Sequence, residues 1–345
     1  MCMKSIINWG KSREKDLACI LPMLPDDIDL FVDPFLGSGD VFLNVKAQRF
    51  AVSDRNEMLI GLWRHASQGL EGFLEKLHAL DDGWRILDEV AFPLMAPLYQ
   101  VADSYLRGVV SDYRLLVDGV GRVLGGGDWG RVLPVCWASA ADLKMELRHT
   151  LVAAMEAIQR DGRCRTQEAI TNRLGTALKE GYFEYLQYLY NASKRPQLRA
   201  SLLLYLLHFS KGGQFVTDPE EKHIVCMEYA GSVMNSVPFT SRLEVLSSGD
   251  FKERMTRTTL AKREYLPLLK HASAREDFIF ADTPTPVKDS AFTAKSQLQL
   301  ATYLLHKTSA RWMVIVGMED PVVQRYRKHK LNFLPYEDEL IIWNY

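Results

Sequence analysis

The chain has 345 residues, of which 47% are hydrophobic and 25% are charged, and its formal net charge is −1. These values are ordinary for a folded globular protein and exclude disordered, collagen-like and coiled-coil chains. Because single hydrophobic cores stop growing at about 250–300 residues, the length predicts a core with a second domain or a large insertion. The near-neutral charge excludes a wholly basic nucleic-acid binder, so a polyanionic partner would require a local basic patch.

The five cysteines are scattered, without a CxxC pair or a histidine at ligand spacing. This pattern predicts a reduced protein without a structural zinc, and we expect no metal. The N-terminus lacks the apolar run of a signal peptide, and the most apolar stretch, residues 202–209, is too short to span a bilayer. The sequence therefore predicts a cytoplasmic protein with no membrane partner.

Residues 28–63 have the pattern of a strand, a loop, a helix, a second strand and a second helix. A short apolar run, Leu30 to Val32, meets an aspartate, a glycine-rich turn and the start of a helix. A second apolar run, Phe50 to Val52, ends at Ser53 and Asp54 before another helical pattern. Together these segments predict a βαβ unit of a parallel sheet.

From about residue 64 to 228, apolar residues recur every three or four positions, as in Tyr182, Tyr185 and Leu186. We interpret these aromatic stripes as helix cores rather than ligand sites. Strand patterns return at residues 243–246, 277–281, 312–316 and 339–344. The sequence therefore predicts an α/β core, residues 1–63 and 229–345, that is interrupted by a mostly helical insertion, residues 64–228.

The loop from Asp33 to Gly39, DPFLGSG, is the most specific local signal in the chain. Its two glycines let the backbone approach a ligand closely, and Asp54 at the end of the next strand is placed to accept hydrogen bonds from ribose hydroxyls. A GxG loop is also found in ordinary tight turns, so the loop alone leaves both interpretations open. No GxGxxG pattern or P-loop is present, which disfavours a dinucleotide or a nucleoside triphosphate.

Several motifs in order resemble those of the Dam-type (DPPY-motif) DNA adenine-N6 methyltransferases. They are INWGKSREK, DPFLGSG, SDRNEMLIGLW, YNASKRPQLRASLLLYLLHFSKGGQF, SRLEVLSSGDFKE, REDFIFADTPTP and ELIIWNY. The resemblance implies a Rossmann-like, S-adenosylmethionine-dependent methyltransferase core with a target-recognition insertion. It also implies double-stranded DNA with a flipped-out adenine as the substrate, as in restriction-modification systems.

Carried over position by position, the resemblance implies a set of residues that bind S-adenosylmethionine: Trp9, Lys11, Asp33, Phe35, Gly37, Gly39, Asp54, Asp250 and Phe251. In that set, Asp54 would hold the ribose, and Asp250 and Phe251 would bound the adenine ring of the cofactor. From the residues alone, Phe35 and Phe251 fit a hydrophobic core equally well, and Asp250 fits a helix cap.

The catalytic motif departs from the family, because Asp282-Thr283-Pro284-Thr285 stands where the family has Asp-Pro-Pro-Tyr. The Asp282 carboxylate and the Thr283 carbonyl remain as acceptors for the hydrogens of a target amine. The aromatic ring that stacks on a flipped base is absent, and such stacking contributes about 1–3 kcal/mol per base. Threonine in place of the first proline predicts a looser turn. Phe280 and Phe292 are the nearby candidates for a substitute stacking face.

The segment that resembles the family's DNA-reading hairpin, residues 208–223, lacks the usual pattern and carries several acidic residues. Four basic residues remain as predicted phosphate contacts: Lys194, Arg195, Arg199 and Lys211. A solvated surface is the alternative interpretation of all four. A second basic run between residues 252 and 270 has the same alternative.

The leading hypothesis is transfer of a methyl group from S-adenosylmethionine to the exocyclic amine of adenine in DNA. The altered DTPT motif supports a rival hypothesis, a catalytically impaired pseudo-methyltransferase that serves as a cofactor- or DNA-binding regulatory or structural subunit. A third hypothesis is methyl transfer to RNA or to another amine.

Overall fold

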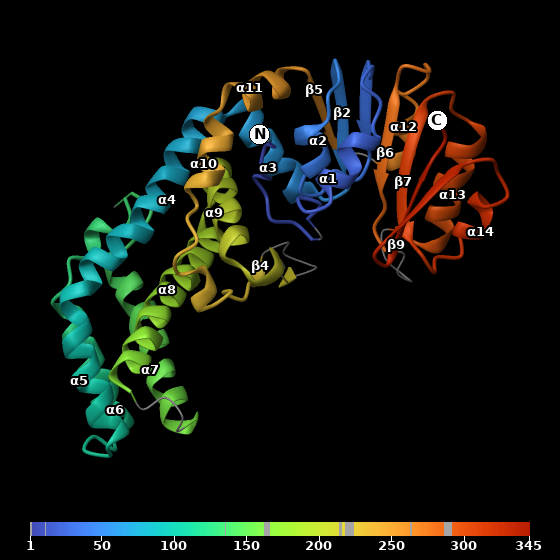
Figure 1. Cartoon of the computed structure of the whole chain (residues 1–345). Helices are drawn as coiled ribbons and strands as arrows, with labels where there is room; N and C mark the ends of the chain where they lie inside the picture. Colours follow the sequence, from blue (N-terminus) through green and yellow to red (C-terminus); the bar gives the residue numbers. More distant parts are fainter. Residues whose placement is uncertain are drawn as a thin grey trace. The chain divides into compact units, whose positions relative to one another are not determined.

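The computed structural model describes residues 2–10, 12–134, 136–161, 166–213, 216–217, 224–262, 264–285 and 292–345. The chain divides into two compact units (Figure 1), Met1–Ile6 with Lys11–Gln68 and Val245–Tyr345, and Ile7–Gly10 with Gly69–Glu244. We call them the sheet unit and the helical unit. The first boundary lies at residue 68 rather than 63 because helix α3 (Glu57–Gln68) continues past residue 63 and packs against strands of the sheet unit. Residues 7–10 and 229–244, predicted for the core, belong to the helical unit.

The sheet unit contains a seven-stranded sheet with the strand order β5-β2-β1-β6-β7-β9-β8. Five strands are parallel, and β9 runs antiparallel to both β7 and β8. The strand bounds are β1 Leu30–Asp33, β2 Arg49–Asp54, β5 Thr258–Lys262, β6 Phe278–Asp282, β7 Arg311–Gly317, β8 Asn332–Tyr336 and β9 Glu339–Trp343. The sheet unit therefore has the Rossmann-like α/β fold that the sequence predicts.

Alternate residues of the buried strands face opposite sides of the sheet, and helices cover both sides. On one side, Val32 and Val314 belong to a core that includes residues of α12 (Tyr265–Leu269), α13 (Ala294–His306) and α14 (Val323–Tyr326). On the other side, Phe42 of α2 (Asp40–Asn44) contacts Phe50 and Trp63 edge-on. The unit is completed by α1 (Leu17–Ile20) and α11 (Gly249–Thr256).

The strand prediction for residues 243–246 is wrong, because this segment belongs to helix α10 (Thr240–Ser247). Leu243 and Leu246 lie three residues apart and are both buried, which is a helical spacing that a four-residue window cannot separate from strand alternation. Nor did the sequence patterns predict β5, which lies within the basic run of residues 252–270, or β8.

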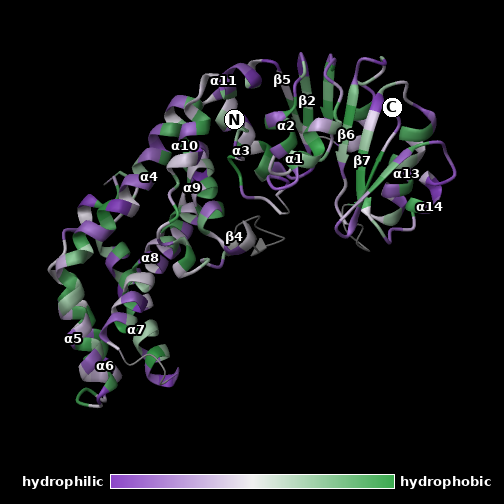
Figure 2. Cartoon of the chain, viewed as in Figure 1, coloured by the Kyte–Doolittle hydropathy of each residue, from purple (hydrophilic) through white to green (hydrophobic). Residues whose placement is uncertain are grey.

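The helical unit consists mainly of six helices, most of which have a hydrophobic and a hydrophilic face (Figure 2), whereas α9 (Pro196–Phe209) is buried along most of its length. The stripe of Tyr182, Tyr185 and Leu186 is buried, so it is a helix core as predicted. None of the helices in the described ranges is long and apolar enough to cross a bilayer. The helix bounds are α4 Leu70–Ala91, α5 Met95–Leu106, α6 Tyr113–Gly125, α7 Ala140–Asp161, α8 Gln167–Ala192 and α9 Pro196–Phe209.

Candidate active site

Three aspartates end neighbouring parallel strands of the sheet unit. Asp33 ends β1, Asp54 ends β2 and Asp282 ends β6. The strand order reverses between β1 and β6, because β2 follows β1 on one side while β6 lies on the other. In open α/β sheets, ligands bind in the crevice at the carboxyl ends of the strands at such a reversal. The fold therefore places the predicted cofactor loop and the predicted catalytic motif at one edge of the sheet.

The loop after β1 is held in a defined shape by its own backbone. The Asp33 carboxylate accepts a hydrogen bond from the Phe35 amide at 3.0 Å. Gly37 and Gly39 have φ angles of 50° and 73°, which glycine adopts far more readily than other residues. A Cβ at Gly39 would lie 2.6 Å from the Trp63 ring, whereas a Cβ at Gly37 would meet only the Phe35 carbonyl oxygen at 3.8 Å. Gly39 is thus required by packing, while the backbone at Gly37 stays open to a ligand.

Asp54 fastens this loop to the end of β2. Its Oδ2 accepts a hydrogen bond from the Gly37 amide at 3.3 Å, and its Oδ1 accepts one from the Asn56 amide at 2.8 Å. A carboxylate has about four acceptor positions, so these bonds leave capacity for ribose hydroxyls. Asp54 therefore has a structural role in the loop besides its predicted contact with the cofactor.

The edge of the sheet is electrostatically unusual. Burial raises the pKa of Asp33 well above its ordinary value, although the Phe35 amide lowers it, and Asp282 and Asp54 raise it further. Burial also raises the pKa of Asp54, against the lowering effect of the amides that it binds. Because Asp282 and Asp54 raise the pKa of Asp33, a cation bound beside Asp33 would lower that pKa again. The edge therefore suits a positively charged ligand.

Arg13 is the main counter-charge at this edge, and the sequence interpretation missed it. Its Nε donates to Asp282 Oδ2 at 2.7 Å and its Nη2 donates to Asp282 Oδ1 at 2.5 Å. The same guanidinium binds Glu339 at the start of β9 and lies 3.2 Å from Asp16. Arg13 lies in the INWGKSREK segment, but no spacing in the sequence links it to residues 282 and 339.

The main chain of this segment also reaches the cofactor loop. The Arg13 amide donates to Asp40 Oδ2 at 2.7 Å, and the hydroxyls of Ser12 and Ser38 donate to the same oxygen. Ser38 lies between the two loop glycines. Residues 12 and 13 therefore connect the loop after β1 to the motif after β6.

The predicted loosening of the DTPT turn is wrong. The Thr283 amide and hydroxyl both donate to the carbonyl oxygen of Ile315 in β7, at 3.2 and 2.8 Å. These bonds pin the turn where proline would supply neither. Pro284 and Thr285 are exposed, so the position of the missing aromatic faces solvent.

The two phenylalanines proposed as substitute stacking faces lie in different surroundings. Phe280 is buried against Phe31 in the sheet and offers no open face. Phe292 packs with Phe35 and Tyr265 in a cluster with ring centroids 5.3–5.8 Å apart. Of these three rings only Phe35 is half-buried, which makes it the ring best exposed to a ligand.

The remaining predicted cofactor residues are less closely tied to this edge. Trp9 belongs to the helical unit, and Lys11 lies outside the described residues. Asp250 is exposed in the first turn of α11, and Phe251 beside it is wholly buried, with its amide bound by the Ser248 cap. Contact of Phe251 with a ligand would require its side chain to move, so its role stays a prediction.

Three of the four predicted phosphate contacts gather at the junction of α8 and α9 in the helical unit. Lys194 and Arg195 are exposed there, and the Arg199 guanidinium lies 4.7 Å from the centre of the Tyr190 ring. Lys211 lies beyond the other end of α9, about 20 Å along the helix at 1.5 Å per residue, and pairs with Glu228 at 3.0 Å. The structure therefore separates Lys211 from the other three.

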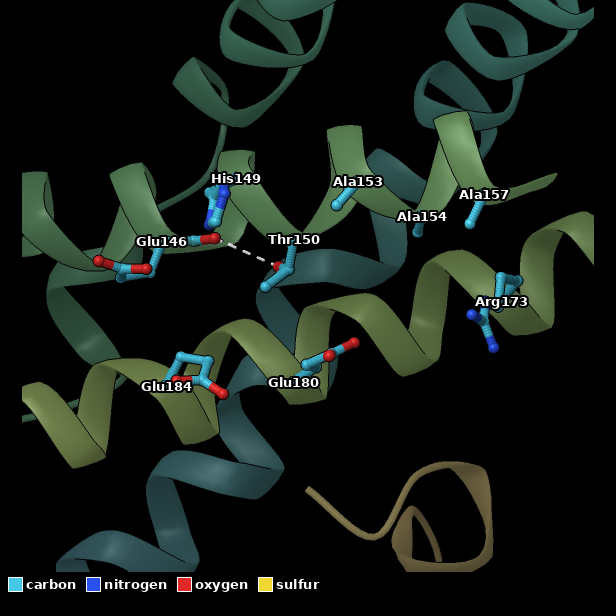
Figure 3. Close-up of a pocket in the computed structure, with 9 residues that line it drawn as sticks. All are labelled: Glu146, His149, Thr150, Ala153, Ala154, Ala157, Arg173, Glu180 and Glu184. Carbon is cyan, nitrogen blue, oxygen red and sulfur yellow. Dashed lines mark hydrogen bonds between the residues drawn. The ribbon is translucent and has the colours of Figure 1, made fainter. Parts of the chain in front are cut away.

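A cavity of about 360 Å³ lies between α7 and α8 (Figure 3). Its polar lining includes Glu146, Glu180, Glu184, His149 and Arg173. Burial and the other two glutamates raise the pKa of Glu184 to about 7. Over the residues that the structure describes, no three or more His, Cys, Asp or Glu side chains are arranged so that they could hold a metal ion, here or elsewhere.

Comparison with known proteins finds a family model that matches one segment of the chain. The model of the D12 class N6 adenine-specific DNA methyltransferases matches residues 10–84, which include the cofactor loop and Asp54 but not the DTPT motif. This match confirms the predicted resemblance over that segment. Modification methylase StsI of Streptococcus sanguinis is 36% identical over 63 residues, which make up 18% of this chain and 10% of that protein.

Proposed function

We propose that the chain is a DNA adenine-N6 methyltransferase that takes its methyl group from S-adenosylmethionine. The observation that carries the proposal is the convergence of the open loop at Gly37, Asp54 and Asp282 at one edge of a Rossmann-like sheet. The match of residues 10–84 to the adenine-specific family supports the substrate class.

The residues at the edge fit S-adenosylmethionine. The backbone at Gly37 is open to close approach, Asp54 has acceptor capacity for ribose hydroxyls, and the pKa of Asp33 is raised by burial and by neighbouring carboxylates. When bound, S-adenosylmethionine supplies an electrophilic methyl group on a positively charged sulfur. A cation beside Asp33 would lower the pKa that burial, Asp282 and Asp54 raise, so the positive sulfur suits this position.

The DTPT motif would act on the target amine. The Asp282 carboxylate and the Thr283 carbonyl accept the two amine hydrogens, which directs the nitrogen lone pair outward. As the nitrogen gains positive charge, the Asp282 carboxylate stabilises it, and the hydrogen bonds of Thr283 to Ile315 keep the acceptors in place. The exposed residues Lys194 and Arg195, with the half-buried Arg199, would bind phosphates of double-stranded DNA.

A specific observation favours the second candidate, an impaired pseudo-methyltransferase. Thr285 is exposed and stands where the family has the aromatic ring that stacks on the flipped base. If the lost stacking is a lesion, Thr285→Tyr should raise the rate of adenine methylation by about 10- to 100-fold, from about 1–3 kcal/mol of stacking. Thr283→Pro should instead lower it, because proline cannot replace the two bonds to Ile315. A wild type faster than Thr285→Tyr would mean that Thr285 belongs to a working site.

The proposed function is tested by incubating the protein with methyl-labelled S-adenosylmethionine and mixed-sequence double-stranded DNA. Label recovered as N6-methyladenine supports the proposal. Binding of cofactor and DNA without transfer supports the pseudo-methyltransferase, and label in RNA alone supports the third hypothesis. RNA of mixed sequence and DNA that lacks adenine serve as the two matched controls.

A further inference from the structure

One cation lies among several carboxylates at the catalytic edge of the sheet unit. Only 7% of the Arg13 side chain is exposed, and its guanidinium binds Asp282 through two nitrogens and Glu339 through two. Asp16 lies beside the same group. Planar two-point pairing of this kind fixes the orientation of a carboxylate as well as its charge. The family resemblance assigns no role to Arg13 or Glu339.

The charges around Asp282 make Arg13 more than a simple bridge. Asp16 and Glu339 bring negative charge to this region, and Asp33 at the end of β1 interacts electrostatically with Asp282. Like charges disfavour ionisation, so without Arg13 the Asp282 carboxyl would lose its proton less readily. Burial lowers the pKa of Arg13, but its hydrogen bonds to Asp282 and Glu339 outweigh burial and hold that pKa above its ordinary value. Arg13 therefore stays charged wherever the protein is folded.

We infer that Arg13 is the positioning residue of the DTPT motif, which holds Asp282 ionised and in a fixed orientation, while Glu339 shares its charge. The inference rests on the proposed function, since an ionised Asp282 is needed to accept amine hydrogens. Only 22% of the Asp282 side chain is exposed, so solvent alone does little to stabilise its charge. Arg13 acts on the reaction through Asp282 and does not itself touch the substrate.

The first test is the pH dependence of kcat for wild type, Arg13→Gln, Arg13→Lys and Glu339→Gln. Arg13→Gln should shift the acid limb of the profile upward by about one pH unit or more, so that its loss of kcat is largest at the acid end and is recovered as the pH rises toward 9. Arg13→Lys keeps the charge but not the two-point pairing, so its acid limb should stay in place while kcat falls several-fold. Glu339→Gln removes the second carboxylate that pairs with Arg13, so Arg13 pairs with Asp282 more fully and the acid limb should not shift upward.

Two further variants separate positioning from folding. Arg13→Gln with Glu339→Gln removes one repelling carboxylate, so its acid limb should lie between those of wild type and Arg13→Gln. The matched control is Arg311→Gln. Arg311 is the first residue of β7, and the substitution breaks its ion pair with Asp27. Equal, pH-independent losses in Arg13→Gln and Arg311→Gln would overturn the inference and leave Arg13 as a structural bridge.

The second measurement does not depend on catalysis. The carboxyl carbon of Asp282 is followed by NMR from pH 3 to 9 in protein labelled at aspartate, with Asp282→Asn to identify the signal. The inference predicts that this signal titrates at higher pH in Arg13→Gln than in wild type and Glu339→Gln. If wild type transfers no methyl group, the proposed function fails while this titration still decides the role of Arg13. A signal that titrates at the same pH in all three proteins would overturn the inference.

Discussion

Two groups of carboxylates, one in each unit, differ in how the chain holds them. At the sheet edge, Asp33 and Asp54 accept backbone amides and Asp282 is paired with a buried arginine. In the α7–α8 cavity, Glu180 and Glu184 lie on successive turns of one helix, where like charges repel. At the sheet edge, backbone amides fix Asp33 and Asp54 and Arg13 balances Asp282, so of these two groups the sheet edge is the better candidate site.

The strongest way to break this comparison is to remove one carboxylate from each group. Asp282→Ala should lower methyl transfer by about 100-fold or more while cofactor binding persists, because the lost interaction matters mainly in the transition state. Glu180→Ala, its counterpart in the cavity, should leave the rate within about twofold of wild type. Initial rates and calorimetry check both. Equal losses in the two variants would show that the cavity belongs to the site.

A second comparison concerns the two ends of the strands. Asp54→Ala should weaken binding of S-adenosylmethionine by about 10- to 100-fold, because it loses charged hydrogen bonds to the ribose and to the Gly37 amide. Arg49 is the first residue of β2, and Asp29 is its exposed ion-pair partner. The Asp29→Ala variant lacks this ion pair at the opposite end of the strand and should bind the cofactor normally. Isothermal calorimetry measures both affinities. Unchanged affinity in Asp54→Ala would exclude Asp54 from the cofactor site.

The basic residues of the helical unit give a smaller, salt-dependent effect. Charge reversal of Lys194 and Arg195 should lower DNA affinity and reduce the slope of log affinity against log salt by about one for each phosphate that the protein no longer neutralises. Lys211→Glu should change both less, because Lys211 is already paired with Glu228. Binding titrations at several salt concentrations measure the slopes. If reversal of Lys211 lowers DNA affinity and the salt slope as much as reversal of Lys194 and Arg195, the protein binds DNA through its overall positive field and not through defined contacts.

The smallest expected effect is on stability, through Glu184. Its pKa rises from 4.5 to about 7 through burial and the charges of Glu180 and Glu146. The folded state therefore keeps a proton that the unfolded state releases, so this contribution is present below pH 4.5 and is lost as pH rises through 7. Glu184→Gln should raise the Tm by about 1–3 °C at pH 8, with no gain near pH 4.5. Calorimetry showing the same Tm difference at both pH values would contradict this assignment.

Local patterns predicted much of the sheet unit and the position of its candidate site. Runs such as DFIFA and WMVIV are buried parallel strands, which read as continuous apolar segments. The aspartates that end β1, β2 and β6 lie at one edge of the sheet. The short segments β5 and β8 carry polar residues at the sheet margins, where the pattern is weak.

Long-range pairing accounts for what the sequence did not reveal. Arg13 and Glu339 are 326 positions apart, and only the fold brings them together at Asp282. The hydroxyl of Thr283 reached a β7 carbonyl that no local rule identifies, so the expected loosening of the turn did not follow. The sequence also does not show which face of an aromatic ring is open to a ligand. Only the packed structure shows that Phe35 is half-buried while Phe280 is buried against Phe31.

The most direct test of the account is a crystal structure of the protein with S-adenosylhomocysteine, the demethylated cofactor. The account predicts that the ligand lies at the carboxyl ends of β1 and β2, with its ribose hydroxyls bound to Asp54 and its sulfur facing the DTPT motif. A ligand in the α7–α8 cavity, or at the opposite ends of the strands, would contradict it.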